Sequence, residues 1–292
     1  MKLPALKNLL AAIGAFSVAI IILSALISVI GKGFGFGESI GVIKVEGVIT
    51  DSTEIIGLIR EYADRGDIKA VVVRIDSPGG AVGPSQEIYA ELKKLKAEKK
   101  VVASMGAVAA SGGYYIASAA DKIVANPGTI TGSIGVIIEF MNVEELLKKV
   151  GLKGRVVKSG KFKDTGSPLR DMSEEERLLL QSVIDDVHGQ FIEAVSAGRG
   201  IKKEDVAKLA DGRIFTGSQA LKLGLVDKLG TMEDAIDLGA ELAGISGRPK
   251  VVYPPEEFSG IWKGLLGESV TKTLGEFLPG TRFMYMMPDF SR

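Results

Sequence analysis

Ser111 is the residue with the clearest capacity for chemistry. It stands in the stretch AVAASGGYYIASAADKIVANPGTITGSIGV (107–136), between two small residues and two glycines. A serine placed in this way has backbone close by and open space in front of its hydroxyl, which suits a nucleophile that attacks a carbonyl. The same pattern also suits a tight turn from a strand into a helix, with Ser111 as the helix cap. Nucleophile and cap are therefore the two alternatives for this serine.

A serine nucleophile needs a base, and histidine is a poor candidate in this chain. The sequence holds one histidine, His188, in the middle of an expected helix, where a surface or packing role is favoured over a Ser–His–Asp triad. Lysine is the main alternative, as in serine–lysine hydrolases. A lysine amine must be neutral to accept a proton, and burial among apolar groups lowers its ordinary pKa of about 10.4. Lys158, Lys161 and Lys163 lie close together after an expected strand, and spacing alone does not choose among them.

Two glycine-rich turns offer backbone N–H donors for a tetrahedral oxyanion. The sequence DSPGGAVG (76–83) follows an apolar strand, so Gly79 and Gly80 would lie at the carboxyl edge of a sheet. Gly112 follows Ser111 directly. Glycine suits this role because no side chain blocks the approach of a substrate to the amide. An ordinary turn at the end of a strand explains SPGG equally well when it is taken alone.

Composition excludes several other classes of protein. Lysine plus arginine and aspartate plus glutamate each number 36, so no basic surface for nucleic acid is indicated. The sequence has no cysteine, which excludes disulfides, thiolate zinc sites and a cysteine nucleophile. Clusters of metal-ligating residues and a Walker-type phosphate loop are also missing from the sequence. We therefore expect no metal, no cofactor and no nucleic-acid partner.

An apolar segment near the N-terminus predicts a membrane anchor. Residues 9–30, LLAAIGAFSVAIIILSALISVI, carry no charge, and about 20 apolar residues suffice for a helix to span a bilayer. The segment is longer than the apolar core of a signal peptide and lacks a suitable cleavage region. Lys2 and Lys7 precede it and Lys32 follows it. This positive-inside bias predicts a single-pass protein of the cell membrane, with residues 1–8 in the cytoplasm and the remainder outside it.

The remainder of the chain divides into a linker, a folded domain and a tail. Residues 31–38 include GKGFGFG, which predicts a flexible linker. Residues 39–253 alternate expected strands and helices, which predicts an α/β layer architecture with a largely parallel sheet. Residues 254–292 carry paired prolines and the single Trp262. The alternatives for this tail are packing on its own domain, or contact with a neighbouring subunit, the membrane or the active-site groove.

Hydrophobic periodicity and turn residues give the expected elements of the folded domain. Strands are expected at 39–49, 68–77, 100–105, 121–126, 133–140, 155–160 and 225–227. Helices are expected at 51–65, 84–98, 111–119, 143–151, 173–196, 202–210, 217–223 and 231–243. The long helix begins at Ser173, where SEEE indicates a capping box.

Four segments, in this order, resemble one protein family. They are RIDSPGGAV (74–82), SMGAVAASGGYYIASAADKIVANPGTITGSIGV (104–136), KSGKFKDTGSPLRDMSEEER (158–177) and ADGRIFTGSQALKLGLVDKLG (210–230). The chain resembles the short form of the signal peptide peptidase A family. Members of this family are membrane-anchored serine–lysine peptidases. The resemblance covers roughly residues 40–243 and implies a Clp protease/crotonase-like fold, a layered β-sheet with flanking helices, preceded here by one transmembrane helix.

The resemblance assigns roles to individual residues. It implies that Ser111 is the nucleophile, that Lys163 is the general base, and that the hydroxyl of Ser133 orients the lysine amine. It further implies that the amides of Gly80 and Gly112 hold the oxyanion. The sequence shows no departure from the family pattern at these positions.

The resemblance also implies an activity and an assembly. We expect a membrane-bound serine endopeptidase that degrades remnant signal peptides and similar apolar peptides without a cofactor. A homo-oligomeric ring is implied, for which an octamer is one candidate size, with the serine and lysine often supplied by adjacent subunits. The alternatives are a stomatin-processing serine–lysine protease, a crotonase-type acyl-CoA enzyme and an inactive membrane scaffold. The sequence leaves open the ring size, the cleavage specificity, and whether Ser111 and Lys163 pair within or between subunits.

Overall fold

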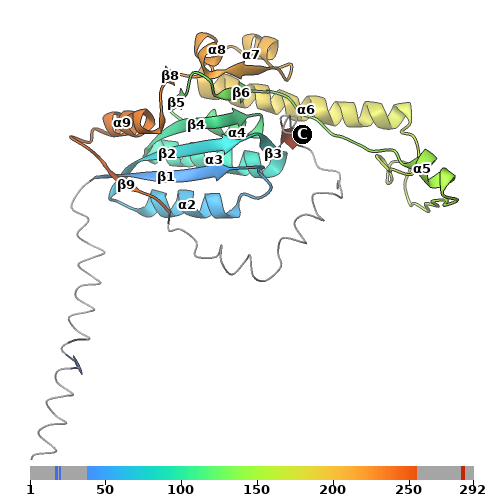
Figure 1. Ribbon diagram of the computed structural model, residues 1–292, viewed down its shortest axis with the longest axis horizontal. Helices are drawn as coiled ribbons and strands as arrows, with labels where there is room; N and C mark the ends of the chain where they lie inside the picture. The colour runs from blue at the N-terminus through green and yellow to red at the C-terminus, as the bar shows by residue number, and fades with distance from the viewer. Residues whose placement is uncertain (1–16, 19, 21–37, 255–283, 287–292) are drawn as a thin grey trace, which may run out of the picture. The chain divides into compact units, whose positions relative to one another are not determined.

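The computed structural model describes residues 17–18, 20, 38–254 and 284–286. The chain divides into two units, Met1–Glu38 and Ser39–Arg292, and the second holds the folded domain (Figure 1). The predicted anchor at 9–30, the predicted linker at 31–38 and most of the tail lie outside the described residues. Among the residues that are described, no helix combines the length and apolar character needed to cross a bilayer.

A largely parallel sheet forms the centre of the domain. Its strands are β1 (Ser39–Glu46), β2 (Ile68–Ser77), β4 (Lys100–Ala110), β5 (Lys122–Ala125), β6 (Ile130–Gly132), β7 (Ile214–Thr216), β8 (Lys228–Leu229) and β9 (Lys250–Val252). The order is β7-β6-β4-β2-β1-β9, with β5 attached to β4 and β8 attached to β5. Only the pairing of β6 with β7 is antiparallel within this sheet. Separately, β3 (Gly79–Ala81) pairs antiparallel with β10 (Met284–Met286).

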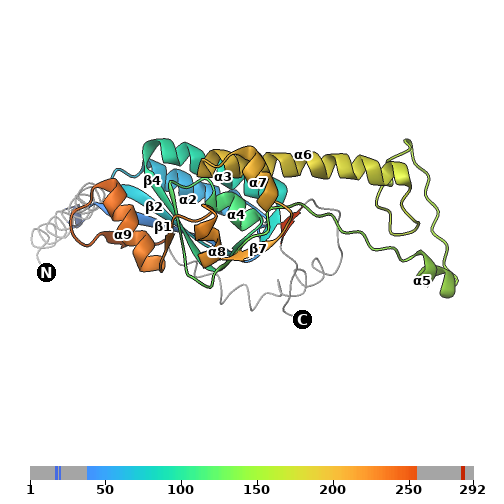
Figure 2. The ribbon, with the colours of Figure 1, turned by 90° about the horizontal axis from the view of Figure 1, so that it is seen from above.

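Helices cover both faces of the sheet. They are α2 (Thr53–Asp64), α3 (Val82–Glu98), α4 (Gly112–Ala117), α5 (Glu144–Lys149), α6 (Glu174–Arg199), α7 (Lys203–Leu209), α8 (Gly217–Lys222) and α9 (Met232–Ala243). One apolar core joins the sheet to α2, α3, α4 and part of α6, and a second core joins the opposite face to α9. Figures 1 and 2 show the sheet between these two layers.

Residue alternation along the strands supplies both cores. In β2, Val71 and Val73 face the first core, whereas Ala70 and Val72 face the second. Successive side chains of a strand point to opposite faces, so the part of a strand that is covered on both sides is apolar at consecutive positions. The continuous apolar run at 68–77 was predicted to be a buried strand for this reason, and the structure confirms it with the same bounds.

Two predicted strands are wrong. Residues 133–140 and 155–160 form no strand, although both are rich in β-branched residues. The edge of the sheet beyond β4 is already filled by β6, which pairs with β7. The N–H of Ser133 donates to the carbonyl of Arg213 and the N–H of Gly212 donates to the carbonyl of Ile134, after which the chain leaves the sheet without forming a further strand. The predicted strand at 225–227 is displaced to β8.

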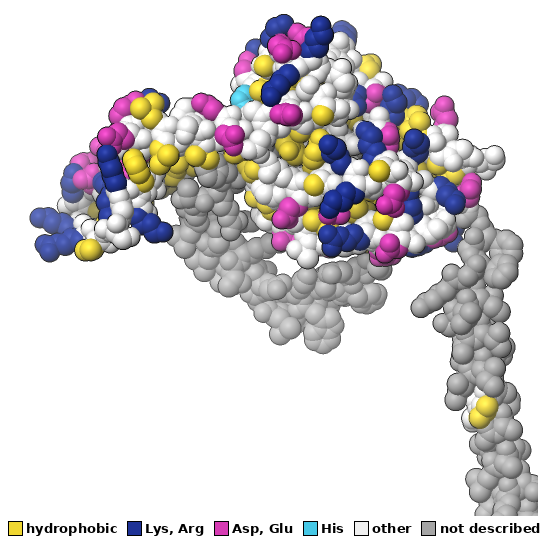
Figure 3. Space-filling model, turned by 180° about the vertical axis from the view of Figure 1, so that it is seen from behind, with side chains coloured by type: hydrophobic (Ala, Val, Ile, Leu, Met, Phe, Trp, Pro, Cys, Tyr) yellow, Lys and Arg dark blue, Asp and Glu magenta, His cyan; other side chains and the backbone are white. Residues whose placement is uncertain are grey.

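Residues 137–186 form an arm that extends from the domain (Figure 2). The arm comprises α5, the loop that follows it and the first half of α6, and within the described part of the chain no extensive packing joins α5 to another helix or strand. Its exposed apolar side chains are Met141, Leu146, Val150, Leu152, Val156, Val157, Phe162, Leu178 and Leu179. Figure 3 shows apolar side chains along this part of the surface. A soluble chain rarely leaves so many large apolar groups in contact with water unless something covers them.

Tyr114 fastens α4 to the domain and gives a first test of the fold. The ring is fully buried, and its hydroxyl donates to the carbonyl oxygen of Leu225 at 2.9 Å. Burial raises the pKa of this phenol well above its ordinary value. Tyr114→Phe leaves the carbonyl without this partner, and we expect a loss of about 1–3 kcal/mol in the free energy of unfolding. Urea unfolding measures this, with the exposed Tyr253→Phe as control; equal stability of the two variants would contradict the assigned contact.

Candidate active site

Ser111 occupies a one-residue turn between a buried strand and a helix. β4 ends at Ala110 and α4 begins at Gly112. The backbone of Ser111 has φ 52° and ψ −118°, a conformation that non-glycine residues rarely adopt and that tends to occur at functional sites. Its N–H donates to the carbonyl of Gly132 at 2.8 Å, which holds the turn in place. The turn therefore projects a serine side chain from the carboxyl end of the sheet.

The hydroxyl of Ser111 has no hydrogen-bond partner. The residue is 1% exposed, and its Oγ is buried without a donor or acceptor among the described residues. Its side chain makes no capping hydrogen bond to α4, so the helix-cap alternative does not explain this serine. A buried polar group without a partner is unfavourable and uncommon, which points to a group that becomes satisfied when another molecule or chain binds.

Ser133 lies beside Ser111. β6 pairs in parallel with the end of β4, with Gly132 opposite Ala110. The residues that follow these two are Ser133 and Ser111, which leave the same edge of the sheet from adjacent strands about 4.8 Å apart. In the described part of the chain, these two serines are the only non-glycine residues with positive φ. The strained backbone is thus concentrated where these two adjacent strands end.

Gly80 and Gly112 approach each other next to Ser111. A Cβ at Gly112 would lie 3.2 Å from the backbone nitrogen of Gly80 and 2.7 Å from Oγ of Ser85. A Cβ at Gly80 would lie 2.1 Å from the carbonyl oxygen of Ile49. Glycine is therefore required at position 112 by the close approach of Ser85 and β3, and at position 80 by the backbone of Ile49. Two backbone amides beside a serine hydroxyl form the kind of arrangement that holds an oxyanion.

Lys163 lies elsewhere in the same chain. It is exposed, on a turn of the arm where its N–H donates to the carbonyl of Gly160 at 3.2 Å. The arm segment that carries this turn lies away from α4 in both ribbon views (Figures 1 and 2). One chain therefore brings Ser111, Ser133, Gly80 and Gly112 together, and it does not bring Lys163 to them.

Arg170 fastens the turn that carries Lys163. Its Nε and Nη2 donate to the two carboxylate oxygens of Asp164 at 3.0 and 2.9 Å, and its Nη1 donates to Glu176 at 2.9 Å. Glu176 also forms the predicted capping box of α6 with Ser173, which the structure confirms. The turn after Lys163 is thus tied to the first residues of α6. The sequence alone does not indicate that Arg170 and Glu176 hold this turn, because their side chains meet only after the loop has folded back onto α6.

The acid titration of this network gives a second test. Arg170, with a smaller contribution from Lys158, lowers the pKa of Asp164 to about 2, and Arg170 also holds the pKa of Glu176 well below its ordinary value. In the unfolded chain these carboxyls have a pKa of about 4. Lowering that pKa in the folded chain stabilises the fold at pH values above about 4, and this stabilisation is lost as the pH falls towards about 2. Hydrogen exchange of residues 158–170, after correction for the intrinsic rate, should therefore be unchanged between pH 8 and pH 5. Arg170→Met should speed it throughout this pH range; equal protection in that variant would contradict the network.

His188 forms no pair with the serine. It is half-buried in α6, and its Nε2 is buried without a hydrogen-bond partner among the described residues. Since Oγ of Ser111 also lacks a partner, no Ser–His hydrogen bond is present in the described structure. Three or more potential metal-ligating side chains do not gather anywhere among those residues.

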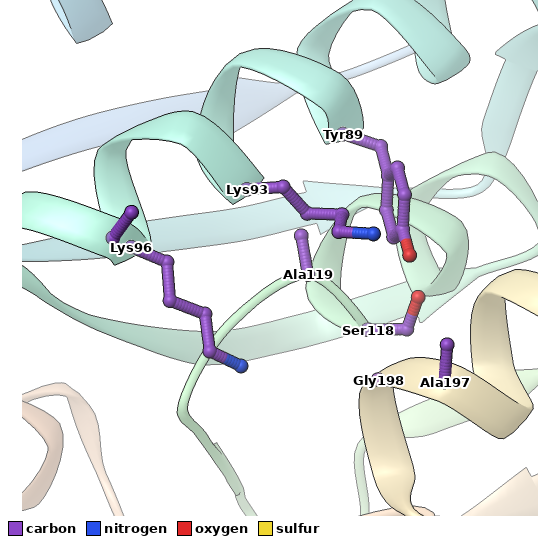
Figure 4. Close-up of a pocket in the computed structure, with 8 residues that line it drawn as sticks. Tyr89, Lys93, Lys96, Ser118, Ala119, Ala197 and Gly198 are labelled. Carbon is purple, nitrogen blue, oxygen red and sulfur yellow. The ribbon is translucent and has the colours of Figure 1, made fainter.

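A separate cavity of about 360 Å³ lies between the end of α3, the end of α4 and α6 (Figure 4). It is lined by Tyr89, Lys93, Lys96, Ala97, Ser118, Ala119, Ala197 and Gly198. The hydroxyl of Ser118 donates to the backbone carbonyl of Tyr115, and the amine of Lys96 donates to the backbone carbonyl of Ala120. None of the predicted site residues lines this cavity.

Comparison with known proteins assigns the chain to a family. Residues 93–246 match the model of Peptidase family S49, and residues 45–129 match that of Clp protease. The chain belongs to peptidase family S49. It is a serine peptidase, as the sequence predicted.

Three relatives of this S49 peptidase are named as proteases or peptidases. It is 51% identical to a putative protease of Synechocystis sp., over 71% of this chain and 76% of the relative. It is 38% identical to a putative signal peptide peptidase SppA of Enterococcus faecium, over 67% of this chain and 61% of the relative. It is 32% identical to the chloroplastic serine protease SPPA of Arabidopsis thaliana, over 85% of this chain and 38% of the relative.

A solved structure shares the fold. A membrane-bound stomatin-specific protease superposes with a TM-score of 0.52 and 16% identity, covering 76% of this chain and 99% of that one. At this level of identity the likeness concerns the fold alone. Together with the Clp protease match, it confirms the predicted α/β fold with a layered sheet and flanking helices.

Proposed function

We propose that this S49 peptidase is a serine–lysine endopeptidase in which Ser111 is the nucleophile and Lys163 the general base. The observation that carries the proposal is the buried, unpartnered hydroxyl of Ser111 on a positive-φ turn. The backbone of Gly80 and Gly112 lies beside that turn. A packing role for Ser111 would leave unexplained both the strained backbone and the missing hydrogen bond.

The reaction follows from these groups. Oγ of Ser111 attacks the peptide carbonyl while the neutral amine of Lys163 takes the hydroxyl proton, and the amides of Gly80 and Gly112 bind the oxyanion. The protonated lysine gives its proton to the leaving amine, which completes the acyl-enzyme. Water, deprotonated by the same lysine, then releases the acyl group and restores the serine. Ser133, beside Ser111, holds the amine in line.

We propose that Lys163 reaches Ser111 from a neighbouring copy of the chain. The arm carries Lys163 on a turn that Arg170 fixes, and it also carries a set of large exposed apolar side chains. A second copy that packed against these side chains would cover them and place its Ser111 turn near the lysine. Such a head-to-tail contact, repeated around a rotation axis, closes a ring. A homo-oligomeric ring therefore accounts for both the apolar arm and the divided site.

The substrates proposed are remnant signal peptides and similar apolar peptides at the membrane. Support comes from the uncharged segment at 9–30 and from relatives named as signal peptide peptidases. The anchor would hold the ring at the cell membrane, with the catalytic domain outside the cytoplasm. The stomatin-processing alternative draws only on a likeness of fold, so the signal-peptide proposal is preferred.

Peptide profiling of the full chain in detergent tests this proposal. Two sets of peptides would be compared, one of apolar signal-peptide cores with small residues and one of segments taken from stomatins. We expect kcat/KM to be at least about tenfold higher for the first set, a difference that pocket contacts with a few side chains can supply. A clear preference for the second set would overturn the substrate assignment, and absence of hydrolysis of either set would overturn the proposed chemistry.

A further inference from the structure

Ser77, the last residue of β2, joins two backbone segments beside the site. The residue is fully buried. Its hydroxyl donates to the carbonyl of Gly47 at 2.6 Å and accepts from the N–H of Gly79 at 3.1 Å. A serine hydroxyl has one proton to donate, and the carbonyl of Gly47 takes it. Ser77 therefore has no proton left for a ligand, and its hydroxyl ties the turn after β1 to the start of β3.

The same turn after β1 also holds Gly80. The N–H of Ile49 donates to the carbonyl of Gly79 at 2.9 Å, and the N–H of Ala81 donates to the carbonyl of Ile49 at 2.7 Å. Gly80 stands opposite Ile49 in a parallel bridge. In an extended strand, the N–H and C=O groups of successive residues point to alternate edges, so the N–H of Gly80 points away from Ile49. The direction of this proposed oxyanion donor is thus set by the backbone that holds β3 from the other side.

Ser77 also contacts the segments on either side of Ser111. In the register of β2 with β4, Ser77 lies opposite Ala109, two residues before Ser111. On the other side of the nucleophile, a Cβ at Gly113 would lie 2.9 Å from the carbonyl oxygen of Ser77, so the start of α4 packs directly on this residue. One buried residue therefore touches both the strand with the oxyanion donor and the segments that flank the nucleophile.

We propose that Ser77 is a positioning residue for the oxyanion hole, which keeps the N–H of Gly80 aligned with the hydroxyl of Ser111. The inference rests on the proposed function, because it takes the amide of Gly80 to be an oxyanion donor. Such amides act by being held in place before the charge develops, and a misplacement of about 1 Å can lower the rate about 100-fold. Without the hydroxyl, the N–H of Gly79 loses its acceptor and β3 can shift relative to Ser111. The loss falls on the transition state and spares substrate binding.

Two alanine variants of the full-length chain test the inference. Ser77→Ala and Ser118→Ala each remove a fully buried serine hydroxyl that donates to a backbone carbonyl. Ser118 lies at the far end of α4 and serves as the matched control. With an apolar peptide substrate, we expect Ser77→Ala to lower kcat about 10-fold to 100-fold with KM within about threefold, whereas Ser118→Ala keeps both within about threefold. Urea unfolding should show similar losses of stability in the two variants, because each leaves one carbonyl without its donor.

A second pair of variants covers the case in which Ser77→Ala does not fold. Ser77→Cys fills nearly the same space with a group that donates and accepts hydrogen bonds only weakly. We expect Ser77→Cys to keep the fold and to lower kcat at least about fivefold. Ser118→Cys should keep kcat within about threefold, and equal kcat in the two cysteine variants would contradict the inference.

A transition-state analogue separates positioning from a general loss of structure. A peptide aldehyde forms a hemiacetal with Ser111, whose oxygen occupies the oxyanion position, whereas the corresponding peptide alcohol binds without a covalent bond. We expect the Ki of the aldehyde to rise in Ser77→Ala by about the factor by which kcat/KM falls, with the Ki of the alcohol unchanged.

Two sets of outcomes separate this inference from the proposed function. Equal kcat in Ser77→Ala and Ser118→Ala, or an equal rise of Ki for aldehyde and alcohol, would overturn the inference while leaving the proposed function intact. Hydrolysis that persists in Ser111→Ala would overturn the proposed function and the inference with it. The same holds for an unmodified chain that neither hydrolyses the peptide nor binds the aldehyde more tightly than the alcohol.

Discussion

Ser111→Ala and Lys163→Ala are each expected to lower kcat/KM at least about 10⁴-fold while the protein stays folded. Removal of a serine nucleophile or of its base reduces turnover by several orders of magnitude in hydrolases of this type, since each acts only as part of the pair. The measurement is the hydrolysis of a fluorogenic apolar peptide, with far-UV circular dichroism to show that each variant keeps its fold. Because Lys163 is exposed, its replacement should leave the fold intact, and the loss then reports on the reaction.

Lys161→Ala is the matched control for the lysine. Lys161 lies two residues before Lys163 on the same turn, is exposed, and forms an ion pair with Glu175. Exposed ion pairs contribute little to stability, with a median between about 0 and 1 kcal/mol. Its replacement should leave kcat/KM within about threefold of the unmodified chain. Retention of full turnover by Lys163→Ala, or a loss in Lys161→Ala as large as in Lys163→Ala, would contradict the assignment of the base.

Mixing the two inactive variants is expected to restore activity. If the serine and the lysine of each site come from neighbouring subunits, Ser111→Ala supplies the lysine and Lys163→Ala supplies the serine. Random assembly from equal amounts gives an intact pair at about one site in four, because each of the two neighbours is the required variant half of the time. Co-expression of the two chains should therefore yield about a quarter of the unmodified activity.

The control for this mixture is the double variant, which carries both Ser111→Ala and Lys163→Ala. Co-expressed with either single variant, it contributes no missing group and should restore nothing. Mixed assemblies of the two single variants that stay inactive, although mass spectrometry shows both chains in one particle, would contradict the divided site. In that case, an active site could form only if the arm moved and brought Lys163 to Ser111 of the same chain.

Local sequence patterns were sufficient for the elements that are buried on both faces or capped by their own residues. The centre of the strand at 68–77 is a continuous apolar run, AVVV (70–73), because both of its faces are covered, and such a run is visible in the sequence. The start of α6 was visible as SEEE because Ser173 and Glu176 cap each other within one turn. The glycines at 80 and 112 were also noticed, since the residue type itself reports a close approach of backbone.

Features that depend on distant parts of the chain were beyond such reasoning. The runs at 133–140 and 155–160 have the composition of strands, yet neither forms one in the folded domain, where β6 and β7 occupy the sheet beyond β4. The position of Ser133 beside Ser111 follows from the register of β6 with β4, which the sequence does not state. The choice of Lys163 among three nearby lysines came from the family resemblance, since their spacing is equivalent.

Covalent labelling of the full-length protein is the most direct test of the central claim, that Ser111 is a nucleophile activated by Lys163. The protein would be treated with a fluorophosphonate probe, and the modified residue would be mapped by mass spectrometry of its peptides. The account predicts a single adduct on Ser111 in the unmodified chain, formed at least about 100 times more slowly in Lys163→Ala, since the base is needed to activate the hydroxyl. An adduct on a different serine, or labelling of Ser111 at the same rate without Lys163, would contradict it.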